Sequence, residues 1–102
     1  MASFELAPEA EADIDGIFDY TARLWGAEQG YKYLLQLNEC AEKIGVGKGR
    51  YKDFSHIRPG LRSIRCQHHY IYFVRMEDMS ARIVAVFHER MDLMARIAER
   101  LK

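Results

Sequence analysis

Cationic side chains recur at or near the ends of three strand-like runs in the second half of the chain. The runs are Arg58–Ser63, His69–Arg75 and Ile83–Leu93. Strands joined by tight connections lie side by side, so a sheet would present these groups as a row. We call this set the cationic row, and its members are Arg58, Arg62, Arg65, His88 and Arg90. Guanidinium groups bind carboxylates and phosphates in a fixed geometry, which makes the row the candidate functional surface.

Arginines and tyrosines are the residues that most often anchor interfaces, and both types occur on these runs. The candidates for binding a target or a partner are Arg58, Arg62, Arg65, Tyr70, Tyr72, His88, Arg90 and Asp92. Arg90 has two interpretations, because it could extend the cationic row or pair with Glu89 or Asp92 at the start of the last helix. Tyr20 and Trp25 are expected in the core or at the edge of a helical hairpin, and a contact with a target is the alternative.

The charges are distributed unevenly along a chain that is neutral as a whole, with 15 basic and 15 acidic residues. Residues 1–45 hold nine acids and three bases, whereas residues 46–102 hold six acids and twelve bases. The stretch 48–65 alone has six bases and one acid. This asymmetry indicates either an anionic partner for the second half or two solvated faces of opposite sign.

The length of 102 residues and the 49% hydrophobic content indicate one domain, residues 1–102, with one core and little room for a large cofactor. No run approaches the roughly 18 apolar residues of a membrane span, and no signal-peptide pattern opens the chain, so we expect a cytoplasmic protein that binds no membrane.

His68 and His69 lack a surrounding ligand set, so neither a metal site nor a cofactor is predicted. Cys40 and Cys66 lie on different elements without a CxxC pattern, which favours reduced thiols over a disulfide.

Two helices are predicted in the first half of the chain. Pro8 stands at the expected first helical position, and the acids that follow it suit the positive end of a helix dipole. Apolar residues then recur at spacings of three and four up to Trp25, after which Gly26 ends the helix. A second apolar stripe runs from Ala27 to Ile44. Because the junction is so short, the two helices are expected to form an antiparallel hairpin.

Strands are predicted on both sides of this hairpin. A short strand, Ser3–Leu6, precedes it, and three strands follow at about Leu61–Cys66, His69–Met76 and Ala81–His88. Their β-branched and aromatic content and short connections predict two consecutive antiparallel hairpins. Asp92 can then cap a terminal helix. The order β-α-α-β-β-β-α defines an α+β fold in which a helical hairpin packs on a mainly antiparallel sheet.

This order of elements, together with a set of sequence landmarks, resembles the ParE branch of the RelE/ParE toxin superfamily. The landmarks are Leu6–Ala10, Asp13, Ile14, Ile17, Tyr20, Trp25, Gly26, Tyr33, Arg58–Ser63, Tyr70–Phe73 and Val86–Asp92. They extend from about residue 4 to residue 93, and their joint order and spacing carry the resemblance. Ala7, His69 and Met91 depart from the pattern of the family, which affects details of the basic surface more than the fold.

The resemblance implies a bacterial type II toxin–antitoxin module, in which a small toxin is neutralised by an antitoxin whose flexible C-terminal segment wraps it. The ParE branch is known for poisoning DNA gyrase, and the RelE branch for cutting mRNA on the ribosome. The expected partners are therefore a ParD-like antitoxin and DNA gyrase. No sequence-specific binding of nucleic acid by the toxin alone is expected.

A ribonuclease would need a set of residues that this chain lacks in part. RNA cleavage through the 2′-hydroxyl needs a base, an acid and cations at the phosphate. RelE-type enzymes, by resemblance, use lysines on the strand here occupied by Leu61–Cys66, arginines on neighbouring strands and a tyrosine near the C-terminus. This chain has no Lys between Lys52 and Lys102 and no Tyr after Tyr72.

His88 is the one group on these strands that could carry a proton, with Arg62 and Arg65 to hold the phosphate, because arginine itself stays protonated. A structural role for His88, hydrogen-bonded to a neighbouring carbonyl or to Asp92, is the favoured interpretation. We therefore expect a toxin that inhibits gyrase by binding, with no catalytic residues. Two alternatives stay open: a RelE-like mRNA endonuclease that uses His88, Arg62 and Arg65, and a non-toxic family member that binds an antitoxin.

Overall fold

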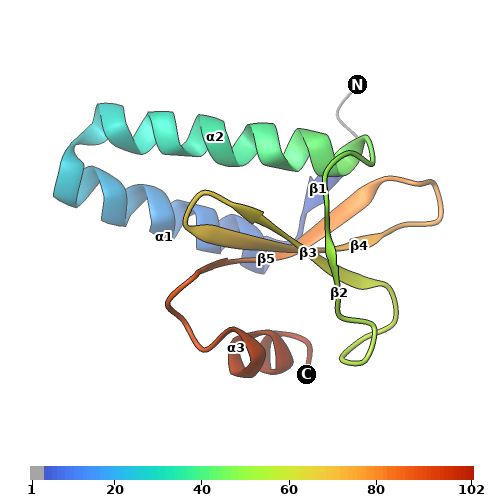
Figure 1. Cartoon of the computed structure of the whole chain (residues 1–102). Coiled ribbons are helices and arrows are strands. Elements are labelled where there is room, and N and C mark those ends of the chain that lie inside the picture. Colours follow the sequence, from blue (N-terminus) through green and yellow to red (C-terminus); the bar gives the residue numbers. More distant parts are fainter. Residues whose placement is uncertain (1–3) are drawn as a thin grey trace.

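The fold is a sheet between a long helical hairpin and a short C-terminal helix (Figure 1). The computed structural model describes residues 4–102. The elements are β1 (Phe4–Leu6), α1 (Pro8–Trp25), α2 (Ala27–Gly45), β2 (Lys52–Asp53), β3 (Leu61–Cys66), β4 (His69–Arg75), β5 (Ala81–His88) and α3 (Leu93–Arg100). The predicted α+β class and the helical hairpin are confirmed. The start of the first predicted strand, Ser3, lies outside the described residues.

The five strands form one sheet in the order β1-β5-β4-β3-β2. Strands β2 to β5 pair antiparallel, whereas β1 runs parallel to β5, with Phe4 opposite Ala81. The sheet is therefore mixed, and the mainly antiparallel pattern is as predicted. Strand β2 is an addition to the prediction: it joins the sheet through two pairs only, Lys52 with Ser63 and Asp53 with Arg62.

A tight junction makes the hairpin of α1 and α2. Gly26 has φ +94°, a conformation that favours glycine, and its N–H caps α1 by donating to the carbonyl of Ala22 at 2.9 Å. Four residues later, Gly30 brings the two helices into close contact, because a Cβ there would lie 2.9 Å from the ring of Phe18. The two helices thus pack closely at the end where the chain reverses.

Each face of the sheet has its own apolar cluster. The hairpin side joins residues of β3, β4 and β5, such as Ile71 and Phe73, to buried residues of α1 and α2. The opposite side packs Tyr72 and Phe87 against Ile97 of α3. A helical hairpin alone would leave this second face or an edge of the sheet exposed. Helix α3 instead covers part of that face (Figure 1).

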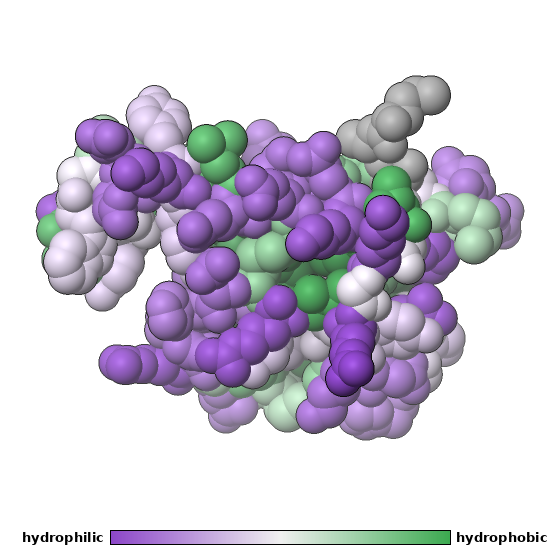
Figure 2. Space-filling view, turned by 45° about the horizontal axis from the view of Figure 1, so that its top comes forward, coloured by the Kyte–Doolittle hydropathy of each residue, from purple (hydrophilic) through white to green (hydrophobic). Residues whose placement is uncertain are grey.

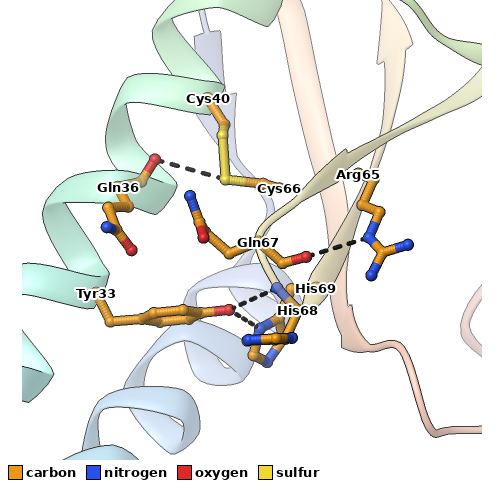
Figure 3. The surroundings of a disulfide bond; sticks show 8 residues. All are labelled: Tyr33, Gln36, Cys40, Arg65, Cys66, Gln67, His68 and His69. Carbon is orange, nitrogen blue, oxygen red and sulfur yellow. Dashed lines mark hydrogen bonds between the residues drawn. A yellow bond between two sulfur atoms is a disulfide. The ribbon is translucent and has the colours of Figure 1, made fainter.

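A disulfide joins Cys40 of α2 to Cys66 at the end of β3, with their Cα atoms 6.2 Å apart (Figure 3). The prediction of two reduced thiols is therefore wrong in this structure, and the described residues include no free cysteine. Sequence spacing did not reveal the pair because packing of α2 against β3 brings the two residues together. The bond closes a loop with a sequence separation of 26, and constraining such a loop in the unfolded chain is worth roughly 3.5 kcal/mol.

Within residues 4–102, no helix has both the length and the apolar character needed to cross a membrane.

Candidate functional site

The pleat of β3 separates the two central arginines of the cationic row. Arg62 points to the same face of the strand as Ile64 and Cys66, which pack on the hairpin side. Arg65 lies opposite Tyr70, which packs on the α3 side. The two guanidinium groups therefore point to opposite faces of the sheet. The prediction of one continuous row is wrong in its geometry, although the part of each residue in binding stays a prediction.

Arg65 takes part in a charged cluster at the turn between β3 and β4. Its guanidinium contacts one carboxylate oxygen of Glu89, and Nδ1 of His68 lies 2.9 Å from the other. The hydrogen bond from His68 and the charge of Arg65 hold the pKa of the Glu89 carboxyl below its usual range. The carboxylate of Glu89 thus bridges the side chains of Arg65 and His68 and does not form a hydrogen-bonded pair with His88.

His69 is buried beside this cluster and is held by Tyr33 of α2 (Figure 3). The Tyr33 hydroxyl accepts from the backbone N–H of His68 at 3.2 Å, so its own proton is available to Nδ1 of His69. Burial, with the neighbouring His88 and His68, lowers the pKa of His69 to about 4. His69 is consequently neutral near pH 7 and joins α2 to the sheet through a hydrogen bond.

His88 closes β5 in a structural arrangement. It lies opposite His69 in the strand pairing, and the two rings pack edge to face with centroids 5.1 Å apart. Nδ1 of His88 accepts from the backbone N–H of Arg90 at 3.1 Å. The expected hydrogen bond to a neighbouring carbonyl or to Asp92 is not found among the described residues, because the partner of His88 is a backbone donor; the structural role of His88 stays a prediction.

The remaining candidates differ widely in accessibility. Tyr72 is only 1% exposed and is packed between Phe54 and Phe87, so it is not available to a partner at the surface. Tyr70 is half-buried, while Arg58 and Arg90 are exposed.

Within residues 4–102 the side chain of Arg90 has no ion pair, and Asp92 caps α3 by accepting from the N–H of Ala95 at 3.3 Å. The predicted helix cap is confirmed, whereas the predicted pairing of Arg90 is not found.

The free end of the hairpin exposes the aromatic residues that we expected in the core or at the edge of the hairpin. Trp25 is 72% exposed and Tyr20 67%, and Tyr31 of α2 is exposed nearby in the chain. Figure 1 shows that this end extends past the strands, and in Figure 2 it carries many weakly coloured residues of intermediate hydropathy. The core expectation fails because the apolar stripes of the helices continue beyond the sheet that they cover.

A groove of about 580 Å³ lies on the hairpin side of the sheet, between the loop after α2 and the turn between β4 and β5. We call it the basic groove, and its lining includes Val46, Lys48, Tyr51, Arg62, Arg75 and Met79. Only Arg62 was among the sequence candidates. The sequence signal that points here is the basic stretch 48–65, which indicates either an anionic partner or a solvated face and does not by itself predict a groove.

The nuclease set considered from the sequence is not assembled by this geometry. Arg62 and Arg65 lie on opposite faces, and Arg65 is already engaged by Glu89. His88 accepts a backbone hydrogen bond on its Nδ1. Among residues 4–102 no group of three His, Cys, Asp or Glu side chains is arranged to hold a metal ion.

Comparison with known proteins agrees with the resemblance inferred from the landmarks. The family model described as the ParE toxin of type II toxin-antitoxin system, parDE, matches residues 4–93. The Toxin ParE of Escherichia coli is 45% identical over 102 residues, which cover all of this chain and 99% of that protein. The Toxin ParE1 of Mycobacterium tuberculosis strain H37Rv is 28% identical over 88 residues, covering 86% of this chain and 90% of that protein.

A solved structure, titled as the chromosomal ParDE TA system from P. aeruginosa, has a similar fold. It superposes with a TM-score of 0.67 at 23% identity and covers 86% of this chain and 96% of the other. At this identity the likeness supports the fold alone. The family match over nearly the whole chain and the identity to the E. coli toxin establish that this chain belongs to the ParE toxin family of type II toxin–antitoxin systems.

Proposed function

We propose that this toxin acts in the cytoplasm by binding DNA gyrase, without cutting RNA, and that a ParD-like antitoxin neutralises it. The single observation that carries the choice between poison and nuclease is the separation of Arg62 and Arg65 onto opposite faces of β3. A phosphate in an RNA backbone needs its cations and its proton carrier around one point. These residues do not meet that requirement.

The exposed aromatic end of the hairpin supports a role in protein binding. Trp and Tyr are the residue types that contribute most to interfaces when they enter a pocket on a partner. Trp25 and Tyr20 are both more than two-thirds exposed here, so neither is needed to fill the core of the toxin. We propose that this end contacts the target, while Arg58 and Arg90 supply exposed charge.

The proposal is tested by measuring gyrase affinity and toxicity for folded variants of three side chains. Truncation of Trp25 to Ala should weaken gyrase binding by about tenfold or more, as expected for a central aromatic contact. His88→Gln should change binding and toxicity by less than about threefold. Arg90→Ala should give a partial loss that shrinks at high salt, because an exposed charge acts through a screened field.

A different pattern would favour the nuclease. In general acid–base catalysis a missing proton carrier costs about two or more orders of magnitude in rate with little loss of affinity. If His88→Gln abolished toxicity while gyrase affinity and folding were unchanged, the RNA-cleaving alternative would replace the binding poison.

A further inference from the structure

The disulfide between Cys40 and Cys66 ties together two parts of the fold on either side of an exposed connection. Strand β1 and helices α1 and α2 precede this connection, and β3, β4, β5 and α3 follow it. Within residues 46–60, every residue except Phe54 and Ile57 is exposed, and β2 is the one regular element. The redox state of the bond therefore decides whether α2 and β3 are held together covalently.

The two sulfur atoms of this bond differ in accessibility. Cys66 is 2% exposed and belongs to the apolar cluster on the hairpin side of the sheet. Cys40 is half-buried at the edge of the same cluster and keeps some contact with solvent. A thiolate breaks a disulfide by attacking one of its two sulfur atoms, and the rate depends on access to that sulfur. An incoming thiolate can therefore reach this bond from the Cys40 side.

The surroundings of Cys66 can also accommodate the thiol that reduction creates. Its Sγ lies 3.5 Å from the carbonyl oxygen of Gln36 (Figure 3), so an S–H at this position has an acceptor in place. Buried residues of α2 such as Ile44 pack on the sheet without help from the bond, and Tyr33 stays hydrogen-bonded to His69. Reduction therefore leaves α2 in contact with the sheet and buries no thiol without a partner.

The cytoplasm, where we place the action of this toxin, is a compartment in which small thiols keep cysteines reduced. Disulfides that form there are usually transient. We propose that Cys40 and Cys66 form a reversible redox site, that its substrate is a low-molecular-weight thiol or the corresponding disulfide, and that Cys40 is the sulfur attacked. This inference rests on the proposed function for the cytoplasmic location alone.

Reduction of the site takes two exchange steps. A thiolate RS⁻ attacks Sγ of Cys40, the bond to Cys66 breaks, and the Cys66 thiolate takes a proton from solvent. A second RS⁻ then attacks the outer sulfur of the mixed disulfide, which releases RSSR and a Cys40 thiolate that is protonated in turn. The protein disulfide has gained two electrons and two protons, and two thiols RSH have become one RSSR. An excess of RSSR drives the same steps backward and restores the bond.

The redox state of this site sets the stability of the toxin. Reduction removes a constraint on the unfolded chain, so the unfolded population rises by roughly two to three powers of ten. Degradation of a folded protein follows the population of its open forms when opening and closing are fast. Oxidation thus prolongs the lifetime of the toxin, and reduction shortens it.

The test places the purified full-length toxin in glutathione buffers and counts free thiols by mass spectrometry after alkylation. In millimolar, mostly reduced glutathione, the native toxin should expose both thiols within hours and keep its circular dichroism spectrum. Transfer to oxidised glutathione should restore the bond. A bond that persists in the native toxin but is reduced in urea would be a permanent structural tie and would overturn the proposal. Loss of the native spectrum on reduction would overturn it as well.

Two single-cysteine variants form a matched pair for the site of attack. In oxidised glutathione, Cys66→Ala should form a mixed disulfide at Cys40 at least about tenfold faster than Cys40→Ala does at Cys66. In urea the two rates should become similar, because both sulfur atoms are then accessible. Equal rates in the native state would contradict the assignment of Cys40. If Cys66→Ala does not fold, Cys66→Ser replaces it, because its hydroxyl can donate to the Gln36 carbonyl.

These outcomes are independent of gyrase and of an antitoxin, since neither is added to the reactions. If the native bond does not exchange with glutathione, the redox site is wrong and the proposed inhibition of gyrase still stands. If the toxin fails to inhibit gyrase, the thiol counts decide the redox site on their own.

Discussion

Replacement of Arg100 by Ala should destabilise the toxin far more than loss of any exposed ion pair. Both oxygens of Asp13 on α1 accept from the guanidinium of Arg100 on α3, at 2.9 and 3.0 Å. The same carboxylate accepts from the N–H of Val86, and Arg100 donates to the carbonyl of Val84. The guanidinium also lies 5.0 Å from the ring centroid of Phe87. One ion pair thus fixes both helices to the same strand.

The expected magnitude follows from burial. The side chains of Arg100 and Asp13 are only 20% and 17% exposed, so truncating one partner leaves the other charge poorly solvated. Breaking a buried pair in this way costs about 3 to 5 kcal/mol, and we take the lower end because some solvent reaches the site. The Arg82–Glu5 pair is the matched control: it is 37% and 54% exposed and should contribute only about 0 to 1 kcal/mol.

Urea unfolding followed by far-ultraviolet circular dichroism measures this difference, and Trp25 fluorescence is a poor probe because that side chain is already exposed. Arg100→Ala should lower the unfolding free energy by about 3 kcal/mol and the melting temperature by roughly 12 °C or more. A double-mutant cycle with Asp13→Ala should give a coupling energy well above 1 kcal/mol. If Arg100→Ala costs no more than Arg82→Ala, the network does not hold α3 on the sheet as described.

Three further perturbations have defined outcomes. Cys40→Ser should lower the unfolding free energy by roughly 3.5 kcal/mol and make it insensitive to dithiothreitol. The wild type should lose a similar amount on reduction, and equal stability of the wild type with and without dithiothreitol would contradict this. Because the pKa of His69 is about 4 when folded and about 6.5 when unfolded, the unfolded chain binds more protons between these values, so stability should fall as pH drops from about 6.5 to about 4. Melting curves should show that His69→Gln reduces this dependence, while His56→Gln, at an exposed site, retains it; identical pH profiles would count against a buried neutral imidazole. Gly16→Ala should stabilise the toxin by about 0.5 to 1 kcal/mol, because a Cβ there meets nothing within 4 Å. Gly30→Ala should destabilise it, because its Cβ would lie 2.9 Å from the ring of Phe18 on α1. A gain in melting temperature for both variants would show that the hairpin is less tightly packed.

The helices and the central strands could be predicted because their patterns are local. Pro8 gave the start of α1 and Gly26 its end, and β-branched and aromatic content with short connections gave the bounds of β3 and β5. Asp92 located the start of α3 through its capping chemistry. Strand β2 was missed because two residues inside a basic loop carry no alternation, and their pairing depends on β3.

The arrangement of the site was only partly within reach of the sequence. Arg62 and Arg65 are three residues apart on one strand, so an odd spacing already placed them on opposite faces, and this signal was overlooked. The contacts between Cys40 and Cys66 join segments far apart in the chain and leave no local pattern. The exposure of Trp25 depends on how far the hairpin extends past the sheet, which helical periodicity does not reveal.

Two parallel reactions distinguish a binding poison from a nuclease most directly. Purified toxin is added to a gyrase supercoiling and cleavage-complex reaction and, separately, to a ribosome-dependent mRNA cleavage reaction. We predict inhibited supercoiling that is reversed by the ParD-like antitoxin, and intact mRNA at the same toxin concentration. Specific mRNA cleavage together with normal gyrase activity would contradict the proposed mechanism.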